Sequence, residues 1–318
     1  MKAIIYQKYG PPEVLQLAET EKPVPRDNEI LIKMKATAVN SADCRLRRAD
    51  PFLVRLIFGL FKPRNPVLGM IVSGEVEKTG KNVTLFREGD QVFGSTELLL
   101  GAYAEYTCVP EDITLALKPA SWTFEEAASV PFGAHTAISF LKMACTQPGK
   151  KVMIYGASGA VGTAAVQLAR HLGAEVTAVC STANLDLAKS LGAHHVLDYT
   201  KEDFSKINEK WDIIFETVGK IPVHLIARLV KEGGSLILGS ALLKGMIQGK
   251  WISWTRKCRV IMGSAKATRK QLDQLRELME TGAIQPVIDK TYTLDQMAKA
   301  HQYVDTGHKK GNVVIRVQ

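Results

Sequence analysis

The spacing of hydrophobic residues divides the chain into two parts. Up to about residue 120, short apolar runs are separated by Gly, Pro, Asn and Asp, which predicts β-strands joined by turns. These runs are MKAIIY, EILIKMKATAV, VSGEVEKTG, DQVFGS and AYAEYTCV. From Thr123 onward the spacing becomes helical, first over residues 124–130 and then over residues 136–144. We therefore expect an all-β part followed by a part that contains both helices and strands.

The second part centres on residues 150–182. Residues 151–155 form a short β-rich apolar run, residues 163–172 have apolar positions at helical spacing, and residues 175–180 are apolar again. The glycine-rich residues 156–162 cannot continue the first run as a strand. This order predicts one strand-turn-helix-strand unit.

Further strand-like runs follow this unit, with helical segments between most of them. They predict a doubly wound sheet of six parallel strands. The chain then turns back through two helices and a closing strand, GNVVIRV, which we expect to rejoin the first domain. The predicted strands are residues 195–199, 211–217, 235–240 and 259–263, and the predicted helices are residues 269–281 and 294–306.

The turn at residues 156–162 partly matches the dinucleotide fingerprint G-x-G-x-x-G, with Ala157 in place of the first glycine. Gly159 has no side chain to hold a pyrophosphate away, and Gly162 lets the helix pack closely on the strand. The helix N-terminus offers N–H groups to the phosphates. Because the turn lies between a strand and a helix, it favours a dinucleotide site over a tight turn without a ligand.

Composition limits the class of protein. The 318 residues are 46% hydrophobic and 23% charged, which is typical of a globular protein of about two domains. The longest apolar run near the N-terminus, residues 51–61, is interrupted by Arg55 and is far shorter than a bilayer span. Nothing at Met1 resembles a signal peptide, so we expect a cytoplasmic protein.

The cysteines and the net charge exclude further classes. Five cysteines are scattered without a C-x-x-C pair, which predicts reduced thiols and neither disulfides nor a structural zinc site. The net charge of +9 comes from Lys and Arg spread along the chain. A polyanionic cofactor accounts for part of this excess, so we do not expect nucleic-acid binding.

Several phrases, in their order, resemble the medium-chain dehydrogenase/reductase superfamily, and within it the zinc-independent branch of quinone oxidoreductases and enone reductases. The resemblance extends over essentially the whole chain, and the glycine-turn phrase is its most specific part. It implies an α/β protein with a GroES-like β-rich catalytic domain, residues 1–122 and 264–318, and a Rossmann nucleotide-binding domain, residues 123–263. The phrases are GDQVFG, GAYAEY, PFGAHTA, ASGAVGTAAVQLA, LGA, DYT, ETVG and GHKKGNVVI.

The zinc ligands of the zinc-dependent branch are missing. That branch uses an early Cys and a Gly-His-Glu phrase, whereas this chain has Cys44 near the first position and Met70 and Ile71 in place of His and Glu. One thiolate does not make a catalytic zinc site, which needs three protein ligands. We therefore predict no metal.

Without a Lewis acid, the reaction should need little carbonyl polarisation. Hydride transfer from NADPH to a quinone, or to the β-carbon of an α,β-unsaturated carbonyl, meets this condition, and the resemblance implies the same chemistry. One alternative is a binding protein that keeps the reductase fold, as RNA-binding or crystallin-like relatives do. Another is a zinc-free alcohol dehydrogenase, for which no alcohol-activating base is visible.

The resemblance implies four catalytic positions. Asn40 matches an Asn near the nicotinamide and the substrate, where its amide holds a carbonyl oxygen as charge builds. Asp43 and Arg45 follow Asn40, and the alternative for both is a place in a surface turn. A role as general acid does not suit Arg45, because a guanidinium does not release a proton. Thr136 matches a residue that contacts the nicotinamide, with a helix cap or a core hydroxyl as the alternative. For Tyr103 we expect packing in the core.

The end of the second strand predicts NADPH over NADH. NAD-specific sites place a carboxylate there, but residues 180–184 contain no acid, and the next is Asp186. Ser181, Thr182 and Asn184 are expected to bind the 2′-phosphate, with help from Tyr199. The other expected cofactor contacts are Ala157, Ser158, Gly159, Ala160, Val161, Gly162, Thr217, Val218, Gly239, Ser240, Lys310 and Asn312.

Some features have no assigned chemistry. We expect structural roles for His194, for His195, and for His301 and His308, which should flank the last helix. Glu216 should line the cofactor cleft. The resemblance also implies a homodimer that uses the last strand of the nucleotide-binding sheet.

A hydrophobic face within residues 51–63 must be covered. If residues 52–61 are helical, six large apolar side chains share one face. That face either packs in the core, contacts an apolar substrate, or touches a membrane surface. The six residues are Phe52, Leu53, Leu56, Ile57, Leu60 and Phe61.

Overall fold

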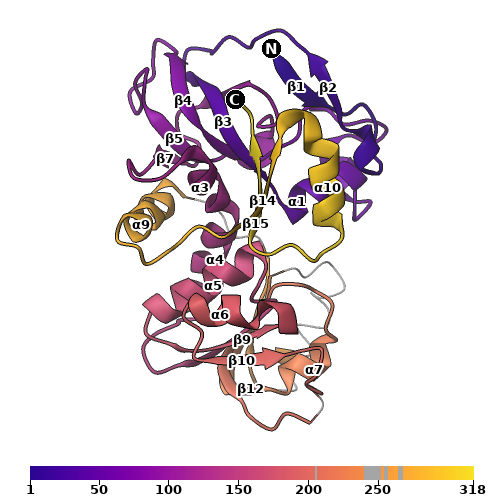
Figure 1. Ribbon diagram of the computed structural model, residues 1–318, viewed down its shortest axis with the longest axis vertical. Coiled ribbons are helices and arrows are strands. Elements are labelled where there is room, and N and C mark those ends of the chain that lie inside the picture. The colour runs from indigo at the N-terminus through magenta and orange to yellow at the C-terminus, as the bar shows by residue number, and fades with distance from the viewer. Residues whose placement is uncertain (205, 240–251, 254–256, 264–267) are drawn as a thin grey trace. The chain divides into compact units, whose positions relative to one another are not determined.

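The computed structural model describes residues 1–204, 206–239, 252–253, 257–263 and 268–318. The chain divides into two compact units. Residues 1–132 and 267–318 form a β-rich unit, and residues 133–266 form the unit that the sequence predicts to bind a nucleotide, called the nucleotide-binding unit below (Figure 1). Ser240 lies outside the described residues. No helix of the described ranges is long and apolar enough to cross a bilayer.

The β-rich unit contains a two-stranded sheet and a seven-stranded sheet. The larger sheet has the order β14-β15-β3-β4-β5-β7, with β6 also paired to β3. Because Val313 of β15 lies opposite Val39 of β3 in an antiparallel pair, the predicted return of the C-terminus to this unit is confirmed (Figure 1). The strands are β1 (Lys2–Ile5), β2 (Gln16–Glu19), β3 (Glu29–Val39), β4 (Ile71–Thr79), β5 (Gln91–Ser95), β6 (Tyr106–Pro110), β7 (Leu115–Leu117), β14 (Ile288–Thr293) and β15 (Asn312–Arg316).

Helices interrupt the part that we predicted to be all-β. The prediction was wrong at α1, which begins after Asn40 because the Asn40 and Asp43 side chains form a reciprocal capping box. Helix α3 packs on β3, β4 and β15, whereas the boundary expected at residue 123 assigns it to the nucleotide-binding domain. The helices of this unit are α1 (Ser41–Arg48), α2 (Val54–Phe58), α3 (Phe124–Ser129), α9 (Arg269–Glu280) and α10 (Met297–Asp305), with short 3-10 turns at Pro12–Val14, Glu97–Leu99 and Leu294–Gln296.

Helix α2 is shorter than predicted and turns the opposite face toward the core. It ends at Gly59, whose φ of +127° is unfavourable for other residues. Val54 and Phe58 pack against the core, whereas the six predicted residues are exposed, with Phe61 at 87%. Packing of that face in the core is therefore wrong, since Val54 and Phe58, four residues apart, are the side chains that the helix turns inward.

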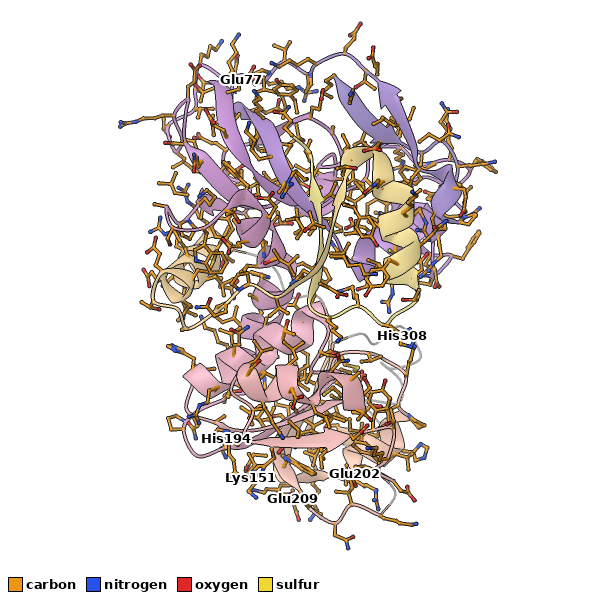
Figure 2. All side chains as sticks on the ribbon, viewed as in Figure 1. Glu77, Lys151, His194, Glu202, Glu209 and His308 are labelled. Carbon is orange, nitrogen blue, oxygen red and sulfur yellow. The ribbon has the colours of Figure 1, made fainter. Side chains whose placement is uncertain are left out.

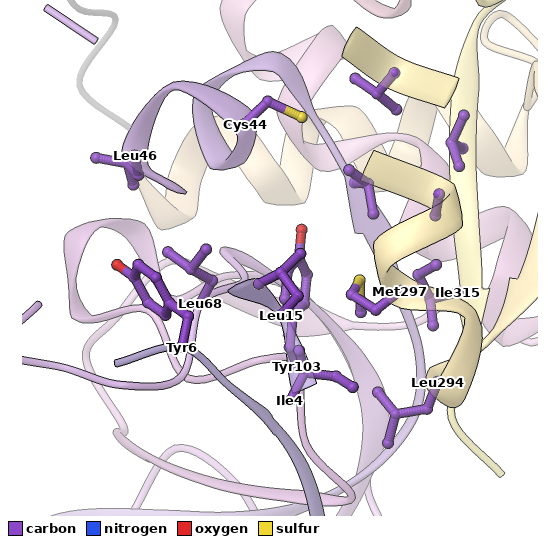
Figure 3. Packing of buried hydrophobic residues seen from close by; sticks show 14 of the residues in the cluster. Ile4, Tyr6, Leu15, Cys44, Leu46, Leu68, Tyr103, Leu294, Met297 and Ile315 are labelled. Carbon is purple, nitrogen blue, oxygen red and sulfur yellow. The ribbon is translucent and has the colours of Figure 1, made fainter. Parts of the chain in front are cut away.

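The main core of the β-rich unit lies between the N-terminal strands, α1 and α10 (Figure 3). It joins residues from both ends of the chain, so the last fifty residues complete a fold begun by the first hundred. Its buried members include Ile4, Tyr6, Leu15, Cys44, Leu46, Leu68, Tyr103, Leu294, Met297 and Ile315.

The nucleotide-binding unit contains the predicted sheet of six parallel strands, in the order β10-β9-β8-β11-β12-β13. The order reverses between β8 and β11, and nucleotides bind at such a switch point in doubly wound sheets. The strands are β8 (Lys151–Tyr155), β9 (Glu175–Cys180), β10 (His195–Asp198), β11 (Trp211–Glu216), β12 (Val230–Leu238) and β13 (Arg259–Ile261). The helices are α4 (Pro131–Met143), which spans the division between the units, α5 (Ala160–His171), α6 (Leu185–Ser190) and α7 (Val223–Ala227), with a 3-10 turn at Thr182–Asn184.

Polar contacts hold the starts of two inner strands of this sheet, β8 and β9. The backbone N–H of Val176 donates to Nδ1 of His194 at 2.9 Å, which is the structural role expected for this histidine. Lys151 pairs with Glu209 at 2.8 Å at the start of β8 (Figure 2). Both contacts lie at the end of the strands opposite to the glycine turn.

Candidate functional site

The glycine turn leaves open space where a phosphate group would lie. A Cβ atom on Gly162 would lie 2.1 Å from the Gly156 carbonyl oxygen, so only glycine lets α5 pack this closely. At Gly159 the nearest atom to such a Cβ is the same oxygen, at 3.7 Å, so the ligand side of the turn is open. Gly159 is the N-cap of α5 and has no side chain that could cap the helix. The first N–H groups of α5 therefore stay available to an anion. These residues fit a dinucleotide pyrophosphate.

The loop after β11 closes one side of the glycine turn. The buried Glu216 carboxylate accepts hydrogen bonds from the N–H groups of Val218 at 2.7 Å and Gly219 at 2.6 Å. The Thr217 hydroxyl donates to the Tyr155 carbonyl oxygen at 2.9 Å, and the Gly239 N–H donates to the Glu216 carbonyl oxygen at 2.8 Å. The structure thus brings Thr217, Val218 and Gly239 to the ends of β8, β11 and β12, and Glu216 holds the loop.

The end of β9 carries the expected 2′-phosphate residues. Asn184 Nδ2 donates to Ser181 Oγ at 3.1 Å, which leaves the Ser181 hydrogen free to donate. The Thr182 hydroxyl donates to the carboxylate of Asp198. Tyr199 is exposed, and its ring centroid lies 6.2 Å from that of Tyr155.

Asp198 was missed from the sequence. It lies at the end of β10, in register with Cys180 at the end of β9, so the sheet brings its carboxylate to the loop that seemed to lack an acid. Hydrogen bonds from Thr182 and Thr200 hold the pKa of the Asp198 carboxyl below its usual value, so it is charged at neutral pH. The DYT phrase held this signal, but only strand pairing shows where the carboxylate lies.

In the β-rich unit, Asn40 presents an unused amide. Its Oδ1 accepts hydrogen bonds from the N–H groups of Ala42 at 2.8 Å and Asp43 at 3.1 Å. Its Nδ2 is buried and has no hydrogen-bond partner within the described part of the chain. Since a buried unpaired donor costs about 1–3 kcal/mol, this group is suited to a ligand oxygen. Arg45 lies on α1, the helix that Asn40 caps, and is half-buried.

A buried polar network lies beside Asn40. His301 Nδ1 lies 3.1 Å from Arg47 Nη1, and His301 Nε2 lies 3.2 Å from the Tyr103 hydroxyl. Arg47 also pairs with Asp305 and donates to the Gly10 carbonyl oxygen at 3.1 Å. His301 lies inside α10 and does not flank it, so its expected position was wrong. Tyr103 is in the core as expected, but its hydroxyl belongs to this network.

Burial shifts the pKa values of this network. Burial raises the pKa of the Asp43 carboxyl to about 7, although the backbone N–H of Asn40, which donates to Oδ2 at 3.1 Å, acts in the opposite direction. Burial also holds the pKa of His301 well below its usual value, with the charges of Arg47 and Arg48 acting in the same direction. His301 is therefore neutral at physiological pH.

The remaining expected residues lie in different surroundings. Thr136 is a half-buried residue inside α4 and does not cap that helix, which begins five residues earlier. Lys310 is exposed, and its backbone N–H donates to Asp289 at 2.8 Å. Asn312 is buried, and its Nδ2 donates to the Val287 carbonyl oxygen at 3.2 Å.

The positions that bind zinc in other branches hold no ligand set. Among the residues that the structure describes, no three His, Cys, Asp or Glu side chains are grouped as metal ligands. The Cys44 sulfur lies 3.4 Å from His301 Nδ1, which already faces Arg47. Burial raises the pKa of the Cys44 thiol, which disfavours a thiolate.

Comparison with known proteins places this arrangement in a family. The description "Alcohol dehydrogenase GroES-like domain" matches residues 26–119, "Alanine dehydrogenase/PNT, C-terminal domain" matches residues 130–234, and "Zinc-binding dehydrogenase" matches residues 191–315. A 2-methylene-furan-3-one reductase of Solanum lycopersicum is 34% identical over 99% of this chain and 79% of that protein. A quinone oxidoreductase of Sus scrofa is 32% identical over 98% of this chain and 95% of that protein.

The chain belongs to the medium-chain dehydrogenase/reductase superfamily. Within this superfamily it falls in the branch of quinone oxidoreductases and alkenal/one reductases, as the sequence indicated. The solved quinone oxidoreductase of Coxiella burnetii has a TM-score of 0.92 at 30% identity, covering 100% of this chain and 99% of that one. The Escherichia coli quinone oxidoreductase, solved with NADPH, has a TM-score of 0.84 at 25% identity with complete coverage of both chains.

The family accounts for the architecture of this medium-chain dehydrogenase/reductase. It confirms the α/β fold with a GroES-like N-terminal domain and a Rossmann-type six-stranded sheet. The family binds NAD(P)H, and the glycine turn has the geometry for that cofactor.

Proposed function

We propose that this chain is an NADPH-dependent, metal-independent reductase of quinones or α,β-unsaturated carbonyls. The observation that carries this proposal is the buried Asn40 amide, whose Nδ2 has no hydrogen-bond partner within the described ranges. A relative from Arabidopsis thaliana named as an NADPH-dependent alkenal/one oxidoreductase is 32% identical over 99% of this chain. That name and the quinone oxidoreductases support the same substrate class.

The residues have separate tasks in this proposal. When bound, NADPH supplies the hydride. The open glycine turn and the N-terminus of α5 hold its pyrophosphate, and the loop fixed by Glu216 supports them. Asn40 Nδ2 donates to the substrate carbonyl oxygen, where negative charge develops as the hydride arrives. Arg45 does not act as the proton donor, since a guanidinium stays protonated.

The preference for NADPH rests on donors at the end of β9. The Ser181 hydroxyl has a free hydrogen, and Asn184 Nδ2 has a second hydrogen besides the one given to Ser181. Each hydrogen bond to a charged group contributes about 1.5–3 kcal/mol, so replacing both residues by Ala should weaken NADPH binding about a hundredfold. NADH binding should change little. Equal catalytic efficiency of the wild type with both cofactors would contradict this preference.

An absorbance assay of NADPH loss tests the whole proposal. Wild type should reduce members of a panel of quinones and enones, and neither EDTA nor phenanthroline should lower the rate. Asn40→Ala should lower kcat about 100-fold, as removal of one oxyanion donor does, while NADPH binding persists. A protein that binds NADPH but reduces nothing in the panel supports the binding-protein alternative. Oxidation of alcohols in the reverse assay supports the alcohol dehydrogenase alternative.

The compartment and the assembly stay predictions. Relatives include a chloroplastic protein of Arabidopsis thaliana and a mitochondrial protein of Bos taurus, so relatives alone do not support the expected cytoplasm. Strand β13 is the edge strand of the nucleotide-binding sheet as described, which suits the expected homodimer contact. Light scattering on the purified protein tests the dimer.

A further inference from the structure

The β-rich unit carries a group of large apolar side chains that face solvent. The six apolar residues of the segment 52–61 have exposed fractions from 46% at Leu60 to 87% at Phe61. Val54 and Phe58 of the same segment pack against the core, so the exposed side chains belong to the other face. Single exposed apolar residues are normal on a protein surface, but a contiguous group marks an interaction site.

A second segment adds Leu98 and Leu99, which are 63% and 53% exposed. Asn65 Nδ2 donates to the Leu99 carbonyl oxygen at 2.9 Å. The N–H of the preceding residue, Arg64, donates to the Phe58 carbonyl oxygen at 2.7 Å. These two hydrogen bonds bring the two segments together. The six side chains of residues 52–61 and the two leucines are called the apolar surface below.

The backbone around the two leucines is strained. Glu97 and Leu100, which flank them, have φ angles of +52° and +60°, in a region that residues other than glycine rarely adopt. The Glu97 carboxylate accepts a hydrogen bond from the Thr114 hydroxyl at 2.6 Å, and its N–H donates to Ser95 Oγ at 3.0 Å. Strain that the surrounding structure holds in this way is common at binding sites. It favours a role in binding for the exposed leucines.

The charges beside the apolar surface are basic. Residues 51–64 contain Arg55, Lys62 and Arg64 and no acidic residue. Lys62 and Arg64 are exposed, and the Arg55 guanidinium lies 5.2 Å from the centroid of the Phe52 ring. The whole chain has a net charge of +9. An anionic partner with an apolar interior is therefore complementary to this surface.

We propose that the apolar surface docks the protein on an anionic lipid bilayer. Its side chains enter the interface, and Lys62 and Arg64 lie among the headgroups. Helix α2 has five residues, whereas a span needs about twenty, so the contact reaches one leaflet only. This inference goes beyond the proposed function and does not depend on it. It is compatible with a contact to an apolar substrate, since an apolar quinone or enone dissolves in the same bilayer.

A second copy of the chain is a poorer partner for this surface. In a symmetric dimer the same surface comes from both copies, so Lys62 and Arg64 of each copy would enter one interface. Like charges brought together in this way repel each other. A bilayer instead offers negative headgroups above hydrocarbon, which matches basic side chains beside apolar ones.

Cosedimentation with vesicles tests the apolar contribution. Wild type should bind vesicles of equal parts phosphatidylcholine and phosphatidylserine, and bind phosphatidylcholine alone more weakly. Leu56→Ser with Leu60→Ser should weaken binding at least about tenfold, and Leu98→Ser should weaken it in the same direction. The control is Leu17→Ser with Leu85→Ser, which changes leucines of 44% and 46% exposure elsewhere in the unit and should leave binding unchanged.

A second pair of variants tests the basic residues. Lys62→Gln with Arg64→Gln should weaken binding to the anionic vesicles about fivefold for each charge removed. Binding to phosphatidylcholine alone should stay the same. Lys78→Gln with Lys81→Gln removes two exposed charges of the same unit and should have little effect. If both pairs weaken binding equally, the net charge alone attracts the vesicles and the proposal is wrong.

Insertion into the bilayer has its own readout. Phe61→Trp should add fluorescence that brominated lipids quench beyond the wild-type background, whereas Val24→Trp, at a position with 77% exposure, should not. A wild type that binds no vesicles, or a Leu56 and Leu60 variant that binds them like wild type, overturns the proposal. So does a wild-type dimer that this variant converts to monomers, because the surface is then an interface between copies. These measurements need no substrate, so their failure leaves the proposed function untouched, and an inactive wild type leaves the docking surface untouched.

Discussion

The Thr182 hydroxyl donates a hydrogen bond to the Asp198 carboxylate and so joins the ends of β9 and β10. This pair puts a negative charge beside the loop expected to bind the cofactor 2′-phosphate. It also engages one of the hydroxyls that we assigned to that phosphate. We therefore expect the choice between NADPH and NADH to depend on a balance between these donors and the Asp198 carboxylate.

Asp198→Asn should strengthen NADPH binding about tenfold and leave NADH binding nearly unchanged. The reason is that the Asp198 carboxylate and the 2′-phosphate carry like charges and repel each other, and the amide of Asn removes this repulsion. Asp186→Asn, at an exposed position in the first turn of α6, is the control and should change neither affinity. Isothermal titration with both cofactors measures the effect. An unchanged or weaker NADPH affinity in Asp198→Asn would mean that the carboxylate does not face the phosphate.

Gly159→Asp should abolish cofactor binding without unfolding the protein. A side chain there meets no atom closer than 3.7 Å to its Cβ, and the φ of −81° suits any residue. The added carboxylate repels the pyrophosphate at close range, so NADPH affinity should fall more than a hundredfold. Gly162→Ala is the contrasting variant, since its Cβ overlaps the Gly156 carbonyl oxygen, and it should lower the melting temperature. A Gly159→Asp protein that still binds NADPH tightly would rule out the glycine turn as the pyrophosphate site.

The exposed apolar face at residues 52–61 is expected to contact an apolar substrate. Leu56→Ser with Leu60→Ser should raise KM for bulky enones at least several-fold more than for a small quinone, and NADPH affinity should stay the same. Since both side chains are exposed, the melting temperature should hardly change. Val54→Ser with Phe58→Ser alters the core-packed face and should lower that temperature instead.

Two other outcomes assign this face differently. If the Leu56 and Leu60 variant keeps its kinetics but loses binding to anionic lipid vesicles, the face is a membrane contact, as Arg55 and Lys62 in the same segment would suit. If the Leu56 and Leu60 variant keeps both its kinetics and its binding to lipid vesicles, the substrate role is wrong.

Two buried groups should make opposite contributions to the pH dependence of stability. The pKa of His301 is well below 6.5 in the fold, so the unfolded chain binds a proton that the folded chain does not, and stability falls as pH drops below about 6.5. The pKa of Asp43 is raised from 3.8 to about 7, so the folded chain keeps a proton that the unfolded chain releases. This second contribution falls as pH rises from about 4 to about 7. Between about pH 4 and 6.5 the two offset each other.

His301→Gln should remove the first contribution and leave the second. As pH rises from 4.5 to 6.5, the free energy of unfolding of His301→Gln should then fall relative to that of wild type, by up to about 1.4 kcal/mol per pH unit. His308→Gln, at an exposed position, should follow the wild type (Figure 2). Urea unfolding at three pH values measures the slopes. Parallel slopes for wild type and His301→Gln would show that His301 titrates alike in both states.

Local patterns in the sequence determined the backbone. The period of 3.6 or 2 in apolar residues marks helices and strands, so the six parallel strands, the glycine turn before α5 and the returning strand β15 were all predictable. Gly162 was predictable as well, because only glycine allows that close approach of helix and strand. The capping box at Asn40 and Asp43 was readable from residue spacing, although we considered only catalytic roles and, as the alternative, a surface turn there.

Tertiary structure decided which side chains meet. Strand register alone brings Asp198 to Thr182, and the packing of α10 alone brings His301 to Tyr103. The segment around α2 is apolar on every face, so its sequence does not show which face turns inward. The surrounding core selects the face that carries Val54 and Phe58. Periodicity describes neighbours within a few residues, whereas these contacts join positions that only folding makes adjacent.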